Sequence, residues 1–462
     1  MQKKPNIVVC TCDQLRAFEV GCYGNDVIRT PNVDRLASEG TRFATAVTNF
    51  PVCMAARSVL ISGQYNRTCT GGVGNVSYPG PPGSFHMPEY PFAGRPHLKN
   101  LTLAEALRNH GYRTSAIGKW HIHSWPHDIG FDEYVIPRVH HCHTGQSFTE
   151  NGGPEFIPEG YSVDFETDRV ERFLHEQQGA DQPFFLYYNI SVPHCPLADA
   201  PHDVRTMYKP EEIPVRPNVD LDRPLKKQDY WFKVYRYDFR YYSLHLPYTE
   251  TLPQGYTLRH LIAEYYGMTT WMDAAVGRML AALDSCGLSE NTIVVFTSDH
   301  GDNLGSHGLV QKGGPNEESV RIPLVVRWPG LGTAGCVNRT HVASLVDLAP
   351  TLLSLTGADI PEHFHGRDLA PLCRGDRADV ETCAFIETGG GAAVRTPGDM
   401  YYLEFADTDH RLADAPSQWF DVVEDPYQLR NLAEDNGDGE NARELDERLR
   451  RWHAEIPWME TK

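Results

Sequence analysis

Four short apolar segments of the chain each end in polar residues suited to binding or catalysis. Their apolar character is continuous rather than alternating, which is typical of strands buried on both faces of a parallel sheet. The carboxyl ends of parallel strands meet at one edge of the sheet, where sites are commonly built. The segments and their polar residues are 6–11 with Asp13 and Gln14, 113–117 with Lys119 and His121, 183–190 with His194, and 292–297 with Asp299 and His300.

Segments with helical periodicity alternate with these strands. This alternation predicts an α/β fold with a large, mostly parallel sheet flanked by helices. The predicted helices are 33–39, 55–61, 101–110, 164–178, 258–283 and 344–356, and a further strand is predicted at 322–327.

The chain changes character near residue 375. Short β-rich runs separated by Gly and Pro turns follow, which is typical of a small antiparallel sheet. We therefore expect a main α/β domain over 1–375 and a smaller C-terminal α+β subdomain over 376–462. The subdomain's predicted elements are strands at 384–387, 392–396 and 400–404 and a closing helix at 443–452.

Two long segments show no regular period. Segment 66–100 is rich in Gly, Pro, Tyr and His, and segment 196–255 is rich in aromatic and charged residues. Loops of this length without regular structure are usually functional, so we interpret both as loops around a site. His140, His141 and His143 form a local cluster that lies either near the pocket or in a solvated loop.

The charge and the cysteine content exclude several classes of partner. The net charge of −19 argues against nucleic acid and against anionic membranes. No run is long enough to span a bilayer, and no secretory leader follows Met1, so we expect a cytoplasmic protein. Eleven cysteines without a CxxC pair indicate a reduced chain, with one cysteine of special purpose.

Asp13 and Asp299 could bind one divalent cation together with Gln14 and His300. Oxygen ligands suit Ca²⁺, Mg²⁺ or Mn²⁺, and a histidine nitrogen is also compatible with Mn²⁺ or Fe²⁺. The alternative is that each aspartate caps a following turn or helix.

Cys53 precedes the predicted helix 55–61, and Arg57 lies one turn later. A cysteine at a helix N-terminus beside an arginine is in an electropositive setting, which would suit a thiolate nucleophile. A buried structural cysteine fits the same pattern. His194 and Lys312 are ambiguous alone, but Lys312 follows Asp299 by a short loop and could return to the same site.

Taken together, these residues resemble the type I sulfatases of the alkaline phosphatase superfamily. The matches occur in the family's order along most of the chain, and they include the strand before Asp13, the segment 30–37, Pro51-Val52-Cys53-Met54-Ala55-Ala56-Arg57, Gly118-Lys119-Trp120-His121, Ser298-Asp299-His300-Gly301 and Lys312-Gly313.

The resemblance implies a role for each site residue. Cys53 would be converted to formylglycine by a maturase and would face one divalent cation, with Ca²⁺ preferred and Mn²⁺ or Mg²⁺ as alternatives. Arg57 would steady the hydrated aldehyde. The remaining metal ligands would be Asp13, Gln14, Asp299 and His300, and the groups that bind sulfate and handle protons would be Lys119, His121, His194 and Lys312.

This set of groups supports a mechanistic hypothesis. One hydroxyl of the hydrated aldehyde attacks sulfur while Asp299 accepts its proton, and His194 with Lys312 protonates the leaving alcohol. His121 then takes a proton from the second hydroxyl as sulfate departs. The metal and the lysines stabilise the charge that develops in transfer.

The expected substrate is a sulfated carbohydrate, because aromatic loops with scattered arginines suit a sugar ring; a sulfated small molecule is the broader class. Two departures from the family pattern keep alternatives open. Gln14 replaces a second aspartate and, with Arg16, is similar to a branch that includes phosphonate monoester hydrolases and phosphodiesterases. Ala55 replaces the signature proline, and an unmodified Cys53 would leave a non-catalytic protein that binds sulfated glycans.

Overall fold

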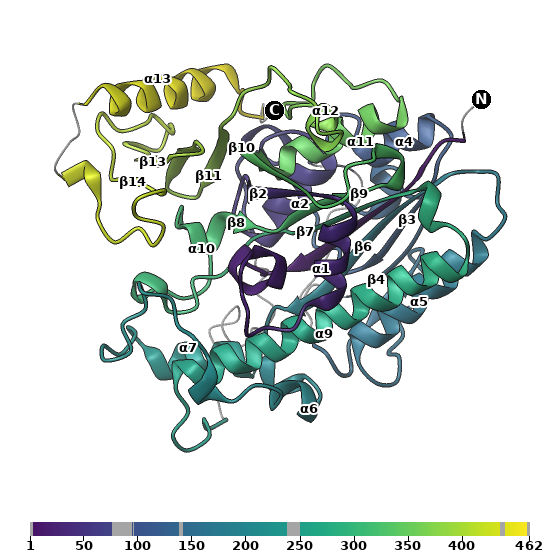
Figure 1. Cartoon of the computed structure of the whole chain (residues 1–462), viewed down its shortest axis with the longest axis horizontal. Helices are drawn as coiled ribbons and strands as arrows, with labels where there is room; N and C mark the ends of the chain where they lie inside the picture. Colours follow the sequence, from purple (N-terminus) through teal and green to yellow (C-terminus); the bar gives the residue numbers. More distant parts are fainter. Residues whose placement is uncertain are drawn as a thin grey trace.

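The computed structural model describes residues 3–75, 95, 97–137, 142–237, 250–434 and 439–459. A large sheet runs through the middle of the molecule, and a small second sheet lies at one end beneath a closing helix (Figure 1). The order of the large sheet is β10-β2-β9-β7-β1-β6-β3-β4-β5, with β8 beside β2. The predicted α/β architecture with a separate antiparallel sheet is therefore confirmed.

The centre of the sheet is formed by β1 between β6 and β7, and all three are parallel. Every residue of these strands is buried, as their continuous apolar sequences predict. The strands are β1 Asn6–Asp13, β2 Thr41–Val47, β3 Arg113–Gly118, β4 Glu133–Pro137, β5 Phe148–Glu150, β6 Phe184–Pro193, β7 Thr292–Ser298, β8 Arg321–Ile322, β9 Leu324–Arg327 and β10 Cys336–Ser344.

The single strand predicted at 322–327 is wrong in its extent. The structure has β8 and β9 on either side of Pro323, which has no N–H to donate to a ladder. β8 pairs antiparallel with β2, whereas β9 runs antiparallel to both β2 and β7. The sheet is thus mixed near this edge and parallel at its centre.

Side chains of β1 point alternately into two hydrophobic cores. Ile7 and Val9 join the core that includes α2, α4 and α11, whereas Val8 and Cys10 join the core that includes α1, α5 and α9. Helices therefore cover both faces of the sheet. The helices of the main domain are α1 Pro31–Glu39, α2 Cys53–Ser62, α3 Asn66–Cys69, α4 Leu103–Asn109, α5 Ser162–Glu176, α6 His202–Arg205, α7 Gln228–Arg236, α9 Leu258–Ser285, α10 Glu317–Val320, α11 Leu348–Thr356 and α12 Ala370–Cys373.

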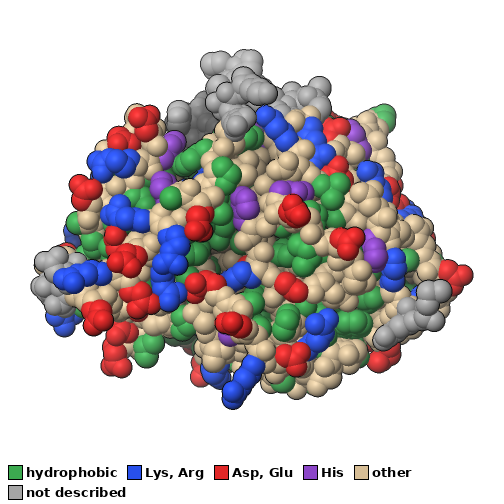
Figure 2. All heavy atoms as spheres, turned by 90° about the horizontal axis from the view of Figure 1, so that it is seen from above, with side chains coloured by type: hydrophobic (Ala, Val, Ile, Leu, Met, Phe, Trp, Pro, Cys, Tyr) green, Lys and Arg blue, Asp and Glu red, His purple; other side chains and the backbone are tan. Residues whose placement is uncertain are grey.

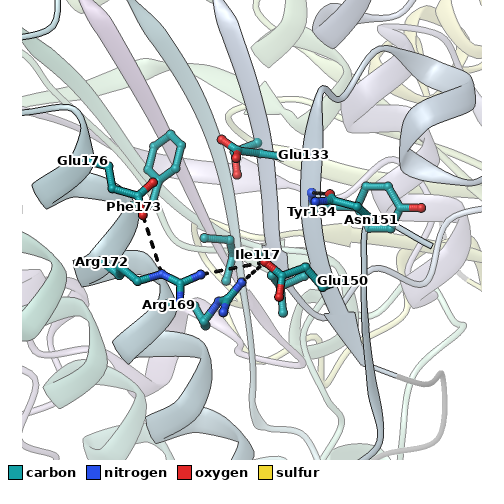
Figure 3. Close-up of a pocket in the computed structure, with 11 residues that line it drawn as sticks. Ile117, Glu133, Tyr134, Glu150, Asn151, Arg169, Arg172, Phe173 and Glu176 are labelled. Carbon is teal, nitrogen blue, oxygen red and sulfur yellow. Dashed lines mark hydrogen bonds and ion pairs between the residues drawn. The ribbon is translucent and has the colours of Figure 1, made fainter. Parts of the chain in front are cut away.

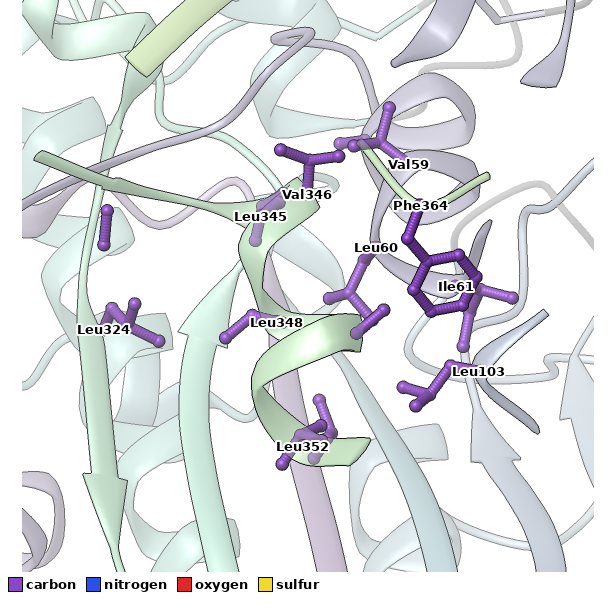
Figure 4. Close-up of a cluster of buried hydrophobic side chains, with 14 of the residues drawn as sticks. Val59, Leu60, Ile61, Leu103, Leu324, Leu345, Val346, Leu348, Leu352 and Phe364 are labelled. Carbon is purple, nitrogen blue, oxygen red and sulfur yellow. The ribbon is translucent and has the colours of Figure 1, made fainter. Parts of the chain in front are cut away.

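Helix α2 is fixed in the core by its second half. Leu60 and Ile61 pack in one cluster with Leu103 of α4 and with Leu348 and Leu352 of α11 (Figure 4). All ten residues of α2 are buried. The N-terminus of this helix is therefore held in place relative to the strand ends.

The C-terminal part contains β11 Ala384–Thr388, β12 Gly391–Arg395, β13 Asp399–Glu404, β14 Gln418–Asp421 and α13 Glu440–Glu455. Successive strands pair antiparallel. Three of these strands match the predicted runs, and β14 is additional. Leu403 and Trp452 belong to the same hydrophobic cluster as Leu345, so this part packs on the main domain, and the boundary near 375 stays a prediction.

The segment 196–255 is more regular than predicted. Its described part carries α6 and α7, and α7 buries Phe232, Val234 and Tyr235. The apolar face of α7 is built largely from aromatic residues that are interspersed with charged ones. This pattern is only a weak sequence signal for a helix.

Acidic and basic side chains are interspersed over the face shown in Figure 2, so the net negative charge is not gathered there in one patch. Among the described helices, none combines the length and the apolar character needed to cross a bilayer.

Candidate active site and metal centre

Four predicted residues converge at the carboxyl edge of the sheet. Ligand atoms of Asp13, Cys53, Asp299 and His300 all lie within 4.8 Å of one another, and all four residues are buried. Asp13 ends β1, and Asp299 directly follows β7. The two strands pair in parallel up to their ends, so the two carboxylates are brought together by the sheet itself.

Cys53 is the first residue of α2 and lies against the acidic strand ends. Its Sγ is 3.1 Å from Nε2 of His300, 3.7 Å from Oδ1 of Asp13 and 3.8 Å from Nζ of Lys119. Burial and Asp13 would raise the pKa of the thiol, but Lys119, Lys312 and His300 together lower it to about 6. An unmodified Cys53 would therefore be largely a thiolate at neutral pH.

Arg57 bridges the two aspartates. Its guanidinium donates to Oδ2 of Asp299 at 3.0 Å and to Oδ2 of Asp13 at 3.1 Å, and Nη1 donates to Oδ1 of Asn189 at 2.8 Å. Because Arg57 lies one helical turn after Cys53, both side chains point to the same edge. Asn189 was missed from sequence, because its segment is otherwise wholly apolar.

The predicted cationic groups line the other side of Cys53. Lys119 forms an ion pair with Asp13. Nζ of Lys312 donates to Oε1 of Gln14 at 2.6 Å and lies 3.2 Å from Nε2 of His194. His121 adopts a left-handed backbone conformation with φ of 45° directly after Trp120 and is buried.

Electrostatics in this site keep His194 and His121 neutral and Lys312 charged. Burial and then Lys312 and Lys119 hold the pKa of His194 well below its usual value, and burial with Lys119 does the same for His121. The pKa of Lys312 is raised although burial alone would lower it, because Cys53 and Asp13 are nearby. Lys312 is therefore the charged proton donor of the Lys312–His194 pair.

Asp13 and Asp299 have pKa values shifted in opposite directions. Burial alone would raise the pKa of Asp13, but Lys119, His194 and Arg57 hold it well below its usual value. Burial and the charge of Asp13 raise the pKa of Asp299. Asp299 is thus the better proton acceptor of the two.

Gln14 is oriented by two residues that sequence reasoning missed. Its Nε2 donates to Oδ2 of Asp302, and the hydroxyl of Tyr235 lies 2.7 and 2.9 Å from the two oxygens of the same carboxylate. The hydroxyl of Tyr235 also accepts the N–H of Gln311, next to Lys312, at 2.7 Å. The amide oxygen of Gln14 is thereby directed into the site. Asp302 stands two residues after His300, a signal that could have been used, whereas Tyr235 comes from a segment predicted to be irregular.

Glu166 of α5 has a buried carboxyl group next to the strand end that carries Lys119. It is 1% exposed, and neither of its oxygens has a hydrogen-bond partner in the described residues. A Cβ at Gly118 would lie 3.4 Å from its carboxyl carbon, so it packs directly against the end of β3. Burial raises its pKa well above the usual value, although Arg57 and Lys119 act in the other direction.

The histidine cluster lies mostly outside the described residues, which include His143 but not His140 or His141. His143 is completely buried and packs edge to face on Trp271, with ring centroids 5.9 Å apart. The solvated alternative is therefore wrong for His143, because its segment is held by Asp199, whose carboxylate accepts its N–H at 2.6 Å.

A small hollow between β3, β4 and α5 is not part of this site. Its volume is about 40 Å³, room for no more than a water or two. Arg169 and Arg172 are paired there with Glu150, and Arg172 also with Glu176 (Figure 3). Glu133, which also lines the hollow, is paired with Arg113.

The donor set at the strand ends fits one hard divalent cation. Ligands at 2.0–2.6 Å from a shared ion can stand up to about 5 Å apart, which matches the spacing of the cluster. Two carboxylates and an amide oxygen are the groups that Ca²⁺, Mg²⁺ and Mn²⁺ prefer. The Sγ of Cys53 marks the place that an oxygen of the modified residue would take.

Comparisons with known proteins agree with this geometry. A family model described as Sulfatase matches residues 5–358. An ulvan-active sulfatase of Formosa agariphila is 30% identical over 474 residues, which cover 98% of this chain and 82% of that protein.

Two solved structures are similar in fold. A protein in complex with its substrate D-glucosamine-2-N,6-O-disulfate has a TM-score of 0.78 at 23% identity, covering 98% of both chains. A phosphonate monoester hydrolase of Agrobacterium radiobacter has a TM-score of 0.72 at 22% identity, covering 98% of this chain and 96% of that one.

Replacing Glu166 by Gln should stabilise the protein increasingly as pH rises. In the unfolded chain the carboxyl of Glu166 has a pKa of about 4.3, whereas in the folded protein its pKa is higher. Folding therefore takes up a proton at pH values above the unfolded pKa. Glu166→Gln removes this uptake. Its melting temperature relative to wild type should therefore rise between about pH 5 and 8, the range above the unfolded pKa, in calorimetric scans.

Glu171→Gln, on the same helix, is the matched control, because its carboxylate pairs with Arg278 at the partly exposed surface. A difference between Glu166→Gln and wild type that is independent of pH would contradict a protonated Glu166.

Replacing Tyr235 by Phe should weaken cation binding. The change removes the hydroxyl that holds Asp302 and, through it, the amide of Gln14. Partners of this kind typically contribute about tenfold to a hundredfold in metal affinity. We expect a loss on that scale in calcium titration calorimetry and in metal content after gel filtration.

The control is Tyr401→Phe, which also removes a Tyr–Asp hydrogen bond, to Asp446 in the C-terminal part. Wild-type calcium affinity in both variants would show that Tyr235 does not position Gln14.

Proposed function

This chain belongs to the sulfatase family and is a sulfuric ester hydrolase, and from that premise we propose that it removes sulfate from a carbohydrate through a formylglycine made from Cys53. The observation that carries the proposal is the contact of Cys53 with two metal-ligating strand ends on one side and with cationic side chains on the other. This combination of proposed metal ligands and cationic groups would attract an anionic ester group.

The proposed cofactors supply the reactive chemistry. A divalent cation, Ca²⁺ by preference, acts as a Lewis acid on sulfate oxygens and lowers the pKa of a bound hydroxyl. Asp13, Gln14, Asp299 and His300 would hold it together with the modified Cys53. Formylglycine, installed by a maturase, would supply two hydroxyls on one carbon once water has added to its aldehyde.

The side chains of the site divide the remaining work. Lys119 and Lys312 bind sulfate oxygens and offset the negative charge that builds up in transfer. Asp299, whose pKa is raised by burial and by Asp13, accepts the proton of the attacking hydroxyl. Arg57 holds both aspartates in place, since it is bonded to each.

The leaving group is served by His194 and Lys312. Nζ of Lys312 lies 3.2 Å from Nε2 of His194, so the charged lysine could protonate this nitrogen, and Nε2 could then give the proton to the departing oxygen. Nδ1 of His194 lies 2.7 Å from the carbonyl oxygen of Cys195, which fixes the orientation of the ring. His121 is kept neutral by burial and by Lys119 and is therefore able to accept a proton from the second hydroxyl.

A carbohydrate substrate is supported by the relatives. The similar Formosa protein is named for its action on ulvan, and another relative, from Bacteroides thetaiotaomicron, is named an N-acetylglucosamine-6-O-sulfatase. One similar structure holds a disulfated glucosamine. A sulfated sugar is thus the substrate class that we propose.

A phosphonate monoester hydrolase or phosphodiesterase is the second candidate. It is favoured by Gln14 in place of a second aspartate, and by the likeness in fold to a phosphonate monoester hydrolase. The metal site alone does not separate sulfur from phosphorus, because both esters present anionic oxygens to the same cation.

Mass spectrometry of the Cys53 peptide, combined with paired substrates, tests the proposal. After co-expression with a competent maturase, the peptide should lose its sulfur and carry an aldehyde. The protein should then hydrolyse 4-nitrophenyl sulfate with a higher kcat/KM than 4-nitrophenyl phenylphosphonate or bis(4-nitrophenyl) phosphate.

Each contrary outcome supports one of the alternative functions. An intact thiol with binding but no turnover of sulfated glycans would favour the non-catalytic glycan-binding protein. Faster turnover of the phosphonate or the phosphodiester would favour the second candidate. Cys53→Ala is the control that should abolish turnover of every ester.

Replacing His194 by Ala should impair poor leaving groups more than good ones. A sugar alkoxide needs its proton in the transition state, whereas 4-nitrophenolate leaves without one. We expect kcat to fall about a hundredfold to ten-thousandfold with a sugar sulfate and much less with 4-nitrophenyl sulfate.

The control is His202→Ala, an exposed histidine of α6, which should leave both rates unchanged. An equal loss on both substrates would assign His194 to sulfate binding instead of proton transfer.

A further inference from the structure

A second pocket lies beside the loop that carries Lys312. Its volume is about 560 Å³, and three separate parts of the chain line it. They are the segment 218–226 before α7, His307 and Gly308 after β7, and Gln428 and Leu429 after β14. The site described above uses none of these residues.

Two buried side chains of this pocket have an unused hydrogen-bonding atom. Oδ1 of Asn218 and Nε2 of Gln428 have no partner in the described residues, and the two residues are 7% and 3% exposed. Their other atoms are fixed: Nδ2 of Asn218 donates to Oε1 of Glu318 at 2.8 Å, and Oε1 of Gln428 accepts the N–H of Glu317 at 2.9 Å. These bonds hold the two side chains in a set orientation in the pocket wall.

The rim of the pocket is cationic. Arg223 and Lys226 are exposed and form no ion pair among the described residues. The carboxylate of Asp220, also in the lining, accepts the N–H groups of Asp222 and Arg223 at 3.0 and 3.1 Å. Of the three residues with formal charge in the lining, two are thus cations and one is a carboxylate.

Apolar side chains complete the wall. Leu225 is buried, and Leu429 is 63% exposed at the mouth. Polar and charged side chains next to apolar surface suit a sugar ring, because it presents both hydroxyls and C–H faces. A volume of this size is within the usual range for ligand pockets and suits one or two sugar units.

The pocket and the active site share one loop. His307 is tied to the pocket wall, since its N–H donates to the carbonyl of Asn218 at 2.8 Å. The same loop continues to Lys312, which contacts Gln14 and His194. The loop that follows β7 therefore contributes residues both to the pocket and to the active site.

We infer that this pocket binds a further sugar unit of the same oligosaccharide that presents its sulfate to Cys53, and that Arg223 and Lys226 take an anionic group of that unit. The inference rests on the proposed function. Sulfate and carboxylate groups on the sugar are recognised by the same cations. The enzyme would therefore prefer chains with several charges over isolated sulfated sugars.

The test compares a double variant with a matched control. Arg223→Ala/Lys226→Ala removes the rim charges, and Arg374→Ala/Arg377→Ala removes two exposed charges after α12. Both are assayed on 4-nitrophenyl sulfate and on size-fractionated ulvan, carrageenan and heparin oligosaccharides, at several NaCl concentrations. All four residues are exposed, and calorimetry checks that each variant is folded.

We expect Arg223→Ala/Lys226→Ala to lower kcat/KM on the preferred oligosaccharide by about tenfold, the scale of two exposed charge contacts, through KM. Its kcat/KM on 4-nitrophenyl sulfate should stay within about twofold, because the rim does not touch the sulfate being cleaved. NaCl should raise KM for the oligosaccharide in wild type and in the control, but much less in the rim variant.

The contrary results are distinct. Three results would each contradict sugar binding in this pocket. They are an equal loss of kcat/KM on both substrates in Arg223→Ala/Lys226→Ala, an unchanged KM for the oligosaccharide in that variant, and an equal loss of kcat/KM in Arg374→Ala/Arg377→Ala. A preference in wild type for neutral-flanked over multiply charged oligosaccharides would do the same. Absence of turnover of every sulfate ester by the matured wild type would instead remove the proposed function on which the pocket rests. If Arg223→Ala/Lys226→Ala loses kcat/KM only on multiply sulfated chains, or only on uronate-bearing chains, the rim cations bind sulfate or carboxylate, respectively.

Discussion

The bridge that Arg57 makes between Asp13 and Asp299 is the interaction on which the site depends. Two carboxylates buried at adjacent strand ends repel each other, and burial of an unpaired charge costs several kcal/mol. A fully buried guanidinium that is bonded to both offsets that cost. Three cationic side chains face two carboxylates here, so a locally positive site exists inside an acidic protein. The cations are Arg57, Lys119 and Lys312.

The fold supplies this arrangement through a few fixed points. Parallel pairing of β1 with β7 brings the aspartates together, and the packing of α2 on α4 and α11 fixes Cys53 opposite them. Gly118 turns the chain at the end of β3 with φ of 90°, and a Cβ there would lie 2.0 Å from the carbonyl of Asn189. A larger residue would therefore push Lys119 away from Asp13. The position of the charge depends on the backbone as much as on the ion pairs.

The sequence predicts those parts of the site that follow from strand direction. Buried parallel strands end at one edge, so polar residues after several such strands were expected to meet there, and the helix that begins at Cys53 follows from its own composition. Partners chosen by tertiary packing were not accessible. Asn189 lies within an apolar strand, Glu166 occupies an ordinary amphipathic helix, and Tyr235 reaches Asp302 from α7, whose aromatic pattern did not indicate a helix. Strands β2 and β10 were missed as well, because three of the seven residues of β2 and six of the nine residues of β10 are not buried and their apolar character is weak.

The departure at Ala55 can be judged on physical grounds. Cys53 is the first residue of α2, and the first backbone bond into the helix is donated by Ala56 to the carbonyl of Val52. The N–H of Ala55 thus belongs to the orphan donors of the first turn, where proline is tolerated because it removes no helical bond. Alanine and proline would therefore both suit the folded helix. Under the proposed function, the difference between them would bear on how a maturase recognises the segment around Cys53, and not on whether the active site can form.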